Sequence, residues 1–114
     1  MKTLIFLHGW GAKGSIWQRQ VEAWGGRFRV LAPDIPAWEA DWLAGYLSNL
    51  ALQETVVVGW SLGGMLLLEA LADSRVVPAG LVLVSAPASF CQQTDYPWGQ
   101  SQAVVRAIDR KSVV

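Results

Sequence analysis

The stretch that most restricts the fold of this chain is TVVVGWSLGGMLLLEAL, residues 55–71. It starts with a continuous β-branched run, as expected for a strand buried on both faces of a parallel sheet. The stretch ends with apolar residues at helical spacing. Between this helix-like part and the strand-like part lies Gly59-Trp60-Ser61-Leu62-Gly63. A buried strand that passes into a helix within a few residues predicts a strand–turn–helix unit of an α/β sheet.

Strand and helix patterns alternate along the rest of the sequence. Four strands are expected, at residues 3–7, 28–32, 55–58 and 80–84. Helices are expected after Ser15 as N-cap to Gly25, over about 38–50, and from Ser61 to about Asp73, with a short helix at 102–110. This alternation predicts parallel strands joined by right-handed crossovers, with ligands bound at the carboxyl ends of the strands.

The turn at residues 59–63 has the form G-x-S-x-G, and its position between strand and helix is the context that a nucleophile elbow requires. Ser61 would sit on a strained turn that exposes its hydroxyl, and Gly59 and Gly63 would leave room for the backbone that passes close by. The backbone N–H of Leu62 could then donate to an oxyanion. The alternative is an ordinary tight turn in which Ser61 caps the helix.

The loop after the first strand, LIFLHGWGAKGS at residues 4–15, permits two interpretations. Gly9, Gly11 and Gly14 form G-x-G-x-x-G, and Asp34 follows at the distance of a ribose-binding acid, which together favour dinucleotide binding. Ser15 as helix N-cap and the bulky indole of Trp10 speak against that interpretation, because phosphate needs bare backbone at a helix N-terminus. In the other interpretation, residues 8–11 supply half of an oxyanion hole.

The motifs HGWG after the first strand and GWSLGG after the third resemble those of the α/β-hydrolase fold family. More narrowly, they resemble the carboxylesterases that cleave pimeloyl-(acyl-carrier protein) methyl ester in biotin synthesis, and SAPASFCQQTDYPWG resembles the way those enzymes enter a lid. The resemblance implies an acyl ester substrate held on acyl-carrier protein, and no cofactor. This sequence departs from the family's pattern at residues 34–38. Asp34-Ile35-Pro36 is present, but Ala37-Trp38 replaces the glycine-rich continuation of the family.

The resemblance also implies roles for individual residues. Ser61 would be the nucleophile, and the backbone N–H groups of Leu62 and Trp10 would form the oxyanion hole while their side chains line the acyl pocket. The remaining motif residues would shape the two loops; they are His8, Gly9, Gly11, Gly59 and Gly63. A weaker alternative is that His8 serves as a surrogate base.

The resemblance covers only the N-terminal half of that family's fold. The expected architecture is therefore a partial α/β-hydrolase fold of about four parallel strands, without the family's first two strands and its C-terminal part. Residues 1–90 would form the partial core, and residues 91–114 would start the lid. In this fold an acid and then a His follow the nucleophile. Downstream of Ser61 the acids are Glu69, Asp73, Asp95 and Asp109, and no His follows, so little activity is expected of the chain alone.

Composition limits the partners of this chain. Nine basic and nine acidic residues give no net charge, which argues against nucleic acid or an anionic membrane as a partner. A single Cys91, a single His and a short N-terminal apolar run argue against a disulfide framework, a metal site and a signal peptide, so a cytoplasmic protein is expected.

Hydrophobic residues make up 53% of the chain, and its mean hydropathy is +0.30. A domain of this size has too much surface for so apolar a sequence to stand alone. We therefore expect self-association or a complementing chain. A non-catalytic module that oligomerises through open sheet edges is the alternative function.

Overall fold

The computed structural model describes residues 2–72 and 77–86. The elements in order are β1 (Thr3–Leu7), a 3-10 helix (Gly14–Trp17), α1 (Gln18–Trp24), β2 (Arg29–Leu31), α2 (Ala40–Leu47), a second 3-10 helix (Leu52–Glu54), β3 (Thr55–Trp60), α3 (Leu62–Ala72) and β4 (Gly80–Val84). The predicted strand–helix alternation is confirmed in this part of the chain.

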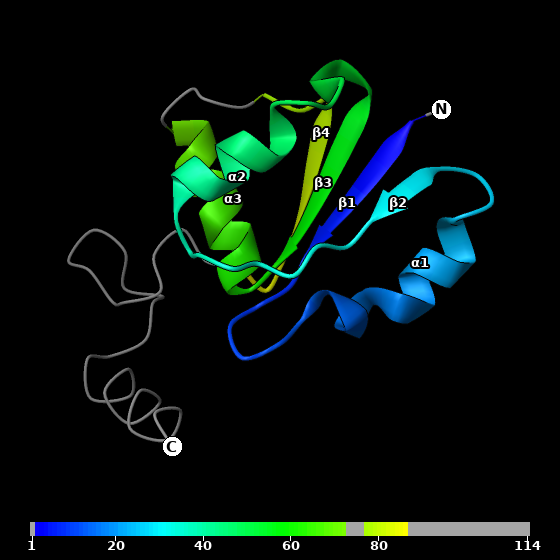
Figure 1. Cartoon of the computed structure of the whole chain (residues 1–114), viewed down its shortest axis with the longest axis horizontal. Coiled ribbons are helices and arrows are strands. Elements are labelled where there is room, and N and C mark those ends of the chain that lie inside the picture. Colours follow the sequence, from blue (N-terminus) through cyan, green and yellow to red (C-terminus); the bar gives the residue numbers. More distant parts are fainter. Residues whose placement is uncertain (1, 73–76, 87–114) are drawn as a thin grey trace.

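The four strands form one parallel sheet in the order β2-β1-β3-β4. Because β1 and β3 are central, their carboxyl ends meet in the middle of one edge of the sheet, as Leu7 lies opposite Gly59. Helices α2 and α3 lie together on one face of the sheet, and α1 lies on the other (Figure 1). The α/β class and the four parallel strands expected from the sequence are confirmed.

The core occupies the space between the sheet and the pair α2 and α3. It consists of strand residues that alternate toward this face and of the apolar faces of the two helices: Ile5, Leu7, Val57, Leu43, Leu47, Leu66, Leu67 and Ala70. On the opposite face Phe6 packs against Trp17, with ring centroids 4.9 Å apart. No residue of α1 is fully buried, so this face is covered much less completely.

The boundaries differ from expectation at the first helix. Ser15 lies inside the 3-10 helix and makes no side-chain capping bond, and α1 begins only at Gln18. The 3-10 helix starts at Gly14, whose amide donates to the side chain of Asp34, so Ser15 is already the second residue of this helix. The expectation that Ser15 caps α1 is therefore wrong.

The other elements differ at their ends. β2 and α2 are shorter than expected, whereas β3 continues to Trp60 because it pairs with β4 up to Val84. The expected helix at residues 102–110 and the expected lid segment at 91–114 lie outside the described residues. Within residues 2–72 and 77–86, no helix has the length and apolar character that crossing a bilayer requires.

The one-sided core predicts which leucines of α3 stabilise the fold. Leu67 has no exposed surface and Leu68 is only half-buried. Replacing Leu67 by Ala is expected to lower the free energy of unfolding by about 2–5 kcal/mol, because the cavity forms in packed surroundings. Urea unfolding followed by circular dichroism measures this. The control Leu68→Ala should cost clearly less, and equal losses would contradict the packing described here.

Candidate active site

Ser61 occupies a turn with unusual backbone geometry at the carboxyl edge of the sheet. It lies between the last residue of β3 and the first residue of α3, and its φ is +53°. A positive φ is uncommon for a residue with a Cβ and indicates local strain that the surroundings must support. The support comes from the Ser61 amide, which donates to Val84 (2.9 Å), and from the Ser61 carbonyl, which accepts from the amides of Gly64 and Met65. The elbow predicted from the sequence pattern is present in the backbone.

Three glycines let the backbone segments around Ser61 approach one another. A Cβ at Gly59 would lie 2.5 Å from the Cα of Gly64. A Cβ at Gly63 would collide with the carbonyl oxygen of His8 and lie 2.9 Å from that of Leu7. Gly59 and Gly63 therefore have the space-making role expected of them, because any side chain would push β3, α3 and the end of β1 apart.

The loop after β1 lies directly against the elbow. A Cβ at Gly9 would lie 3.0 Å from the indole of Trp60 and 3.3 Å from the Cβ of Ser61, and Gly11 has a φ of +78°. Trp10 is 46% exposed between these two glycines. Neither the Trp10 amide nor the Leu62 amide has a hydrogen-bond acceptor within residues 2–72 and 77–86. The loop that carries Trp10 and the turn that carries Leu62 are therefore neighbours, since Gly9 lies against Ser61.

His8 is buried and makes a hydrogen bond through each ring nitrogen. Its Nε2 accepts from the amide of Ile35 (2.9 Å), so the ring proton is on Nδ1, which donates to the carbonyl of Gly9 (2.7 Å). The ring also meets Trp38 edge-on, with centroids 5.5 Å apart. In this arrangement both nitrogens are bound to backbone, and neither is available to take a proton from Ser61.

Asp34 makes a second hydrogen bond between the loop after β1 and the segment after β2, beside the one between His8 and Ile35. Its Oδ1 accepts from the amide of Gly14 at 2.7 Å, and Gly14 is packed so closely against the backbone of Ala32 that it has no room for a side chain. The carboxylate on which the dinucleotide alternative depended is therefore engaged with the chain's own backbone. This agrees with the other interpretation of Asp34 that the sequence allows, a hydrogen-bonded turn residue before Pro36.

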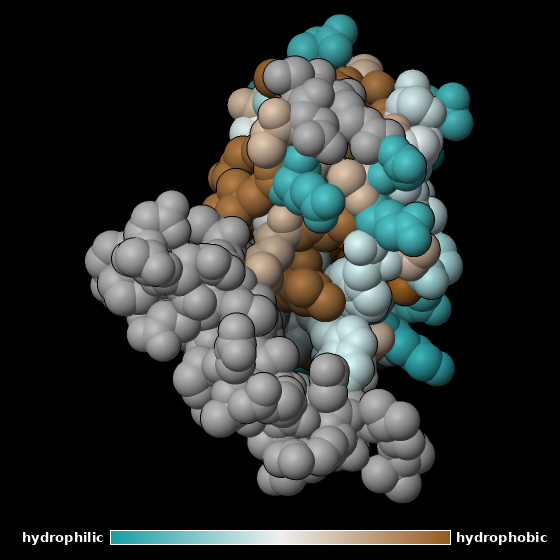
Figure 2. Space-filling model, turned by 90° about the vertical axis from the view of Figure 1, so that its left-hand side faces the viewer, coloured by the Kyte–Doolittle hydropathy of each residue, from teal (hydrophilic) through white to brown (hydrophobic). Residues whose placement is uncertain are grey.

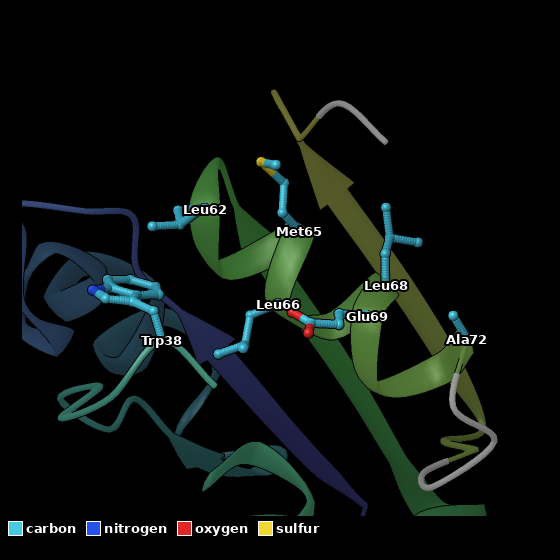
Figure 3. Close-up of a pocket in the computed structure, with 7 residues that line it drawn as sticks. All are labelled: Trp38, Leu62, Met65, Leu66, Leu68, Glu69 and Ala72. Atoms are coloured by element: carbon cyan, nitrogen blue, oxygen red, sulfur yellow. The ribbon is translucent and has the colours of Figure 1, made fainter. Parts of the chain in front are cut away.

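An apolar groove of about 520 Å³ begins beside the elbow and follows α3. Trp38, from the segment before α2, stands across from Leu62 and Leu66, and Met65, Leu68, Glu69 and Ala72 continue the wall along the helix (Figure 3). On the side of the molecule where α2 and α3 lie, hydrophobic surface is gathered between hydrophilic residues (Figure 2). The groove has the size and the lining for an extended apolar group that lies along α3 from Leu62.

Within residues 2–72 and 77–86, no carboxylate is hydrogen-bonded to Ser61, and the sequence contains no His other than His8. Glu69 is exposed on α3, and Asp73, Asp95 and Asp109 lie outside the described residues. Across residues 2–72 and 77–86, no three His, Cys, Asp or Glu side chains are grouped as metal ligands would be. The described groups can therefore supply a nucleophile and hydrogen-bond donors to an oxyanion, but not a general base.

The tie between Asp34 and Gly14 predicts a measurable local effect. Asp34→Ala should speed hydrogen exchange at the Gly14 amide and lower the free energy of unfolding by about 1 kcal/mol, because a hydrogen bond to a partly exposed carboxylate is lost. Asp34→Asn keeps an oxygen acceptor at the same place and should retain most of the protection. Amide exchange followed by NMR measures both variants. Unchanged exchange in Asp34→Ala would show that the bond does not hold the loop.

Comparisons with known proteins show which proteins this chain is similar to. Residues 4–112 match the model of the alpha/beta hydrolase family. The chain is 28% identical over 111 residues to a pimeloyl-(acyl-carrier protein) methyl ester esterase of Nitrosomonas europaea, covering 90% of this chain and 44% of that protein. It is 30% identical over 115 residues to the enzyme of that name from Methylococcus capsulatus, covering 93% and 45%. The chain thus spans less than half the length of the curated relatives it matches.

Solved structures agree on the fold. A thermophilic esterase from Thermogutta terrifontis superposes with a TM-score of 0.66 at 28% identity, over 82% of this chain and 39% of that one. The epoxide hydrolase CorEH superposes with a TM-score of 0.71 at 20% identity, over 96% and 43%, and shows the fold alone. The parallel sheet, the turn at Ser61 and the match over nearly the whole sequence lead to one conclusion: this chain belongs to the alpha/beta hydrolase family.

Proposed function

We propose that this chain is the N-terminal portion of a serine carboxylesterase that hydrolyses an acyl methyl ester, with Ser61 as the nucleophile. The observation that carries the proposal is the strained position of Ser61 between β3 and α3, directly beneath the loop that presents Trp10. Esterases and lipases of this fold expose their nucleophile on such a turn. The helix N-terminus that follows also favours the negative charge that develops during acyl transfer.

The proposed reaction runs through a covalent acyl-enzyme. The Ser61 Oγ attacks the ester carbonyl, and the amides of Leu62 and Trp10 donate to the oxyanion of the tetrahedral intermediate. Methanol leaves, and water then releases the acid from Ser61. A general base has to remove the proton of Ser61 and later that of water. His8, the only His of the sequence, is bound to backbone through both nitrogens, so a histidine base would have to come from polypeptide other than these 114 residues.

The substrate proposed is an acyl methyl ester on acyl-carrier protein, in biotin synthesis in the cytoplasm. Two observations support it. The curated relatives named above carry pimeloyl-(acyl-carrier protein) methyl ester esterase as their name. The groove that starts at Leu62 is walled by Trp38 and by the apolar side of α3, which suits the methylene chain of such an ester.

The nucleophile can be tested by covalent labelling. Intact chain treated for a long time with a large excess of a fluorophosphonate is expected to gain one adduct slowly, located at Ser61 by peptide mass spectrometry, because the elbow presents this hydroxyl beside the amides of Leu62 and Trp10 even without a base. Ser61→Ala should gain none. The matched control is Ser85→Ala, since Ser85 also has a positive φ (49°) and follows the neighbouring strand. Labelling at other serines only, or none at all, would contradict the proposal.

The reaction class can be tested by comparing substrates. Without triad partners, hydrolases keep about 10³–10⁴-fold acceleration over water, so this weak rate is expected for the methyl ester of a seven-carbon acid. No acceleration is expected for an epoxide of similar size. Faster turnover of the epoxide than of the ester would move the chain to another reaction class within the family.

The groove predicts a preference for chain length. Trp38→Ala removes the wall opposite Leu62 and should raise KM for a seven-carbon acyl ester about tenfold, while KM for an acetyl ester changes little. The matched control is Trp24→Ala on α1, an exposed tryptophan on the other side of the sheet. Equal effects of Trp38→Ala on both esters would show that the acyl chain does not lie in this groove.

A further inference from the structure

Among the described residues that line the groove along α3, one carries a charge. Glu69 lies beside six apolar residues, which are Trp38, Leu62, Met65, Leu66, Leu68 and Ala72. Its carboxylate is directed toward Leu66 and the side of the groove where Trp38 lies (Figure 3). Within residues 2–72 and 77–86, Glu69 has no hydrogen-bond or ion-pair partner. A negative charge without a described partner is therefore part of the wall of an otherwise apolar groove.

We infer that Glu69 is a specificity-determining residue that excludes acyl chains ending in a free carboxylate. The methyl ester substrate then carries, at the far end of its chain, a carboxyl group that is neutral because it is bound as an ester, a thioester or an amide. This inference rests on the proposed function, in which the acyl chain attacked by Ser61 lies in the groove along α3.

The charge of Glu69 does not serve the stability of α3. A glutamate stabilises a helix when a cation lies three or four residues away, but these positions within α3 are Met65, Leu66 and Ala72. The described helix ends at Ala72, and a negative charge in the last turn opposes the helix dipole. The groove is therefore a better explanation for a charge at this position than the helix is.

The spacing between Ser61 and Glu69 matches an acyl chain of medium length. Eight positions separate the two residues, which corresponds to about 12 Å of helix. Helical side chains lean toward the N-terminus, which brings the carboxylate closer, to roughly 10 Å from Ser61. An extended seven-carbon chain has six carbon–carbon bonds and spans about 7 Å at about 1.2 Å per bond. The distal carboxyl group of such a chain therefore lies within a few ångströms of Glu69.

Charge then decides which chain ends fit. A free carboxylate at this place lies beside the carboxylate of Glu69, and like charges repel. It also loses water in a groove whose other described lining residues carry no cation to replace that water. An ester or a thioester has no charge and avoids both costs, and an amide can donate its N–H to Glu69. Glu69 therefore favours chains whose distal end is neutral or positive.

The test is direct binding to the full chain carrying Ser61→Ala, which separates recognition from turnover. Three methyl esters with a seven-carbon chain are compared: dimethyl heptanedioate is neutral, monomethyl heptanedioate is anionic, and a methyl heptanoate with a terminal amine is cationic. NMR titration at low salt gives Kd for each ligand and shows whether the amides of α3 shift. The amine is expected to bind about fivefold more tightly than the diester, and the acid about fivefold more weakly, as for one exposed charge pair.

Variants of Glu69 assign this preference to its charge. In Glu69→Gln the three Kd values should agree within about twofold, and Glu69→Lys should reverse their order. The neutral diester should bind both variants as it binds the Ser61→Ala parent, a result that loss of a merely structural contact would not give. Added salt should reduce the differences between the ligands. The matched control is Glu22→Gln, an exposed carboxylate on α1, which should leave the order of the three ligands unchanged.

Three results would overturn the inference. One is equal binding of the three ligands by the chain that retains Glu69, and another is a charge dependence that persists in Glu69→Gln. The third is the absence of shifted α3 amides with every ligand although circular dichroism shows that the chain is folded, since the acyl chain would then not lie in the groove. Failure of the proposed esterase reaction is seen separately, as absence of fluorophosphonate labelling at Ser61, because binding is measured without that hydroxyl.

Discussion

The candidate active site at Ser61 depends on one packing constraint. The backbones at the end of β1, the end of β3 and the first turn of α3 are in direct contact, with glycines where they meet. Gly59 faces Gly64, and Gly63 faces the carbonyls of Leu7 and His8, at distances that no side chain permits. This contact allows the chain to turn from strand to helix within two residues and forces Ser61 into its positive φ. The strain at Ser61 is sustained because three packed segments and the bond to Val84 determine its position together.

A second layer of the site comes from the segment after β2. Residues 34 and 35 hold the loop after β1 at both of its ends, through the carboxylate of Asp34 on Gly14 and the amide of Ile35 on His8. These hydrogen bonds give His8, the only His of the sequence, a structural role. His8 fixes the path of the backbone that carries Trp10, and oxyanion stabilisation depends on donors held in place before the reaction.

The uneven covering of the sheet accounts for part of the high hydrophobic content of the chain. Burial of both faces makes every residue of a parallel strand hydrophobic, which is the pattern of β3 and β4. Among the described residues the face toward α2 and α3 holds the buried core, although Leu81 at the β4 edge of that face is 40% exposed. Part of the hydrophobic excess is therefore located on β4, where Leu81, Val82 and Val84 are exposed.

The sequence by itself determined the α/β class, the strand positions and the elbow at residues 59–63, because strand and helix periodicity and glycine punctuation are local properties. β1 and β4 have the expected bounds, and Ser61 has the expected strain. Only the tertiary structure decided the start of α1 and the hydrogen-bond partners of His8 and Asp34. Each depends on a contact between segments distant in the sequence, such as the 20 residues between Gly14 and Asp34 and the 27 between His8 and Ile35. Local pattern carries no information about such partners, since only the folded sheet brings them within hydrogen-bond distance.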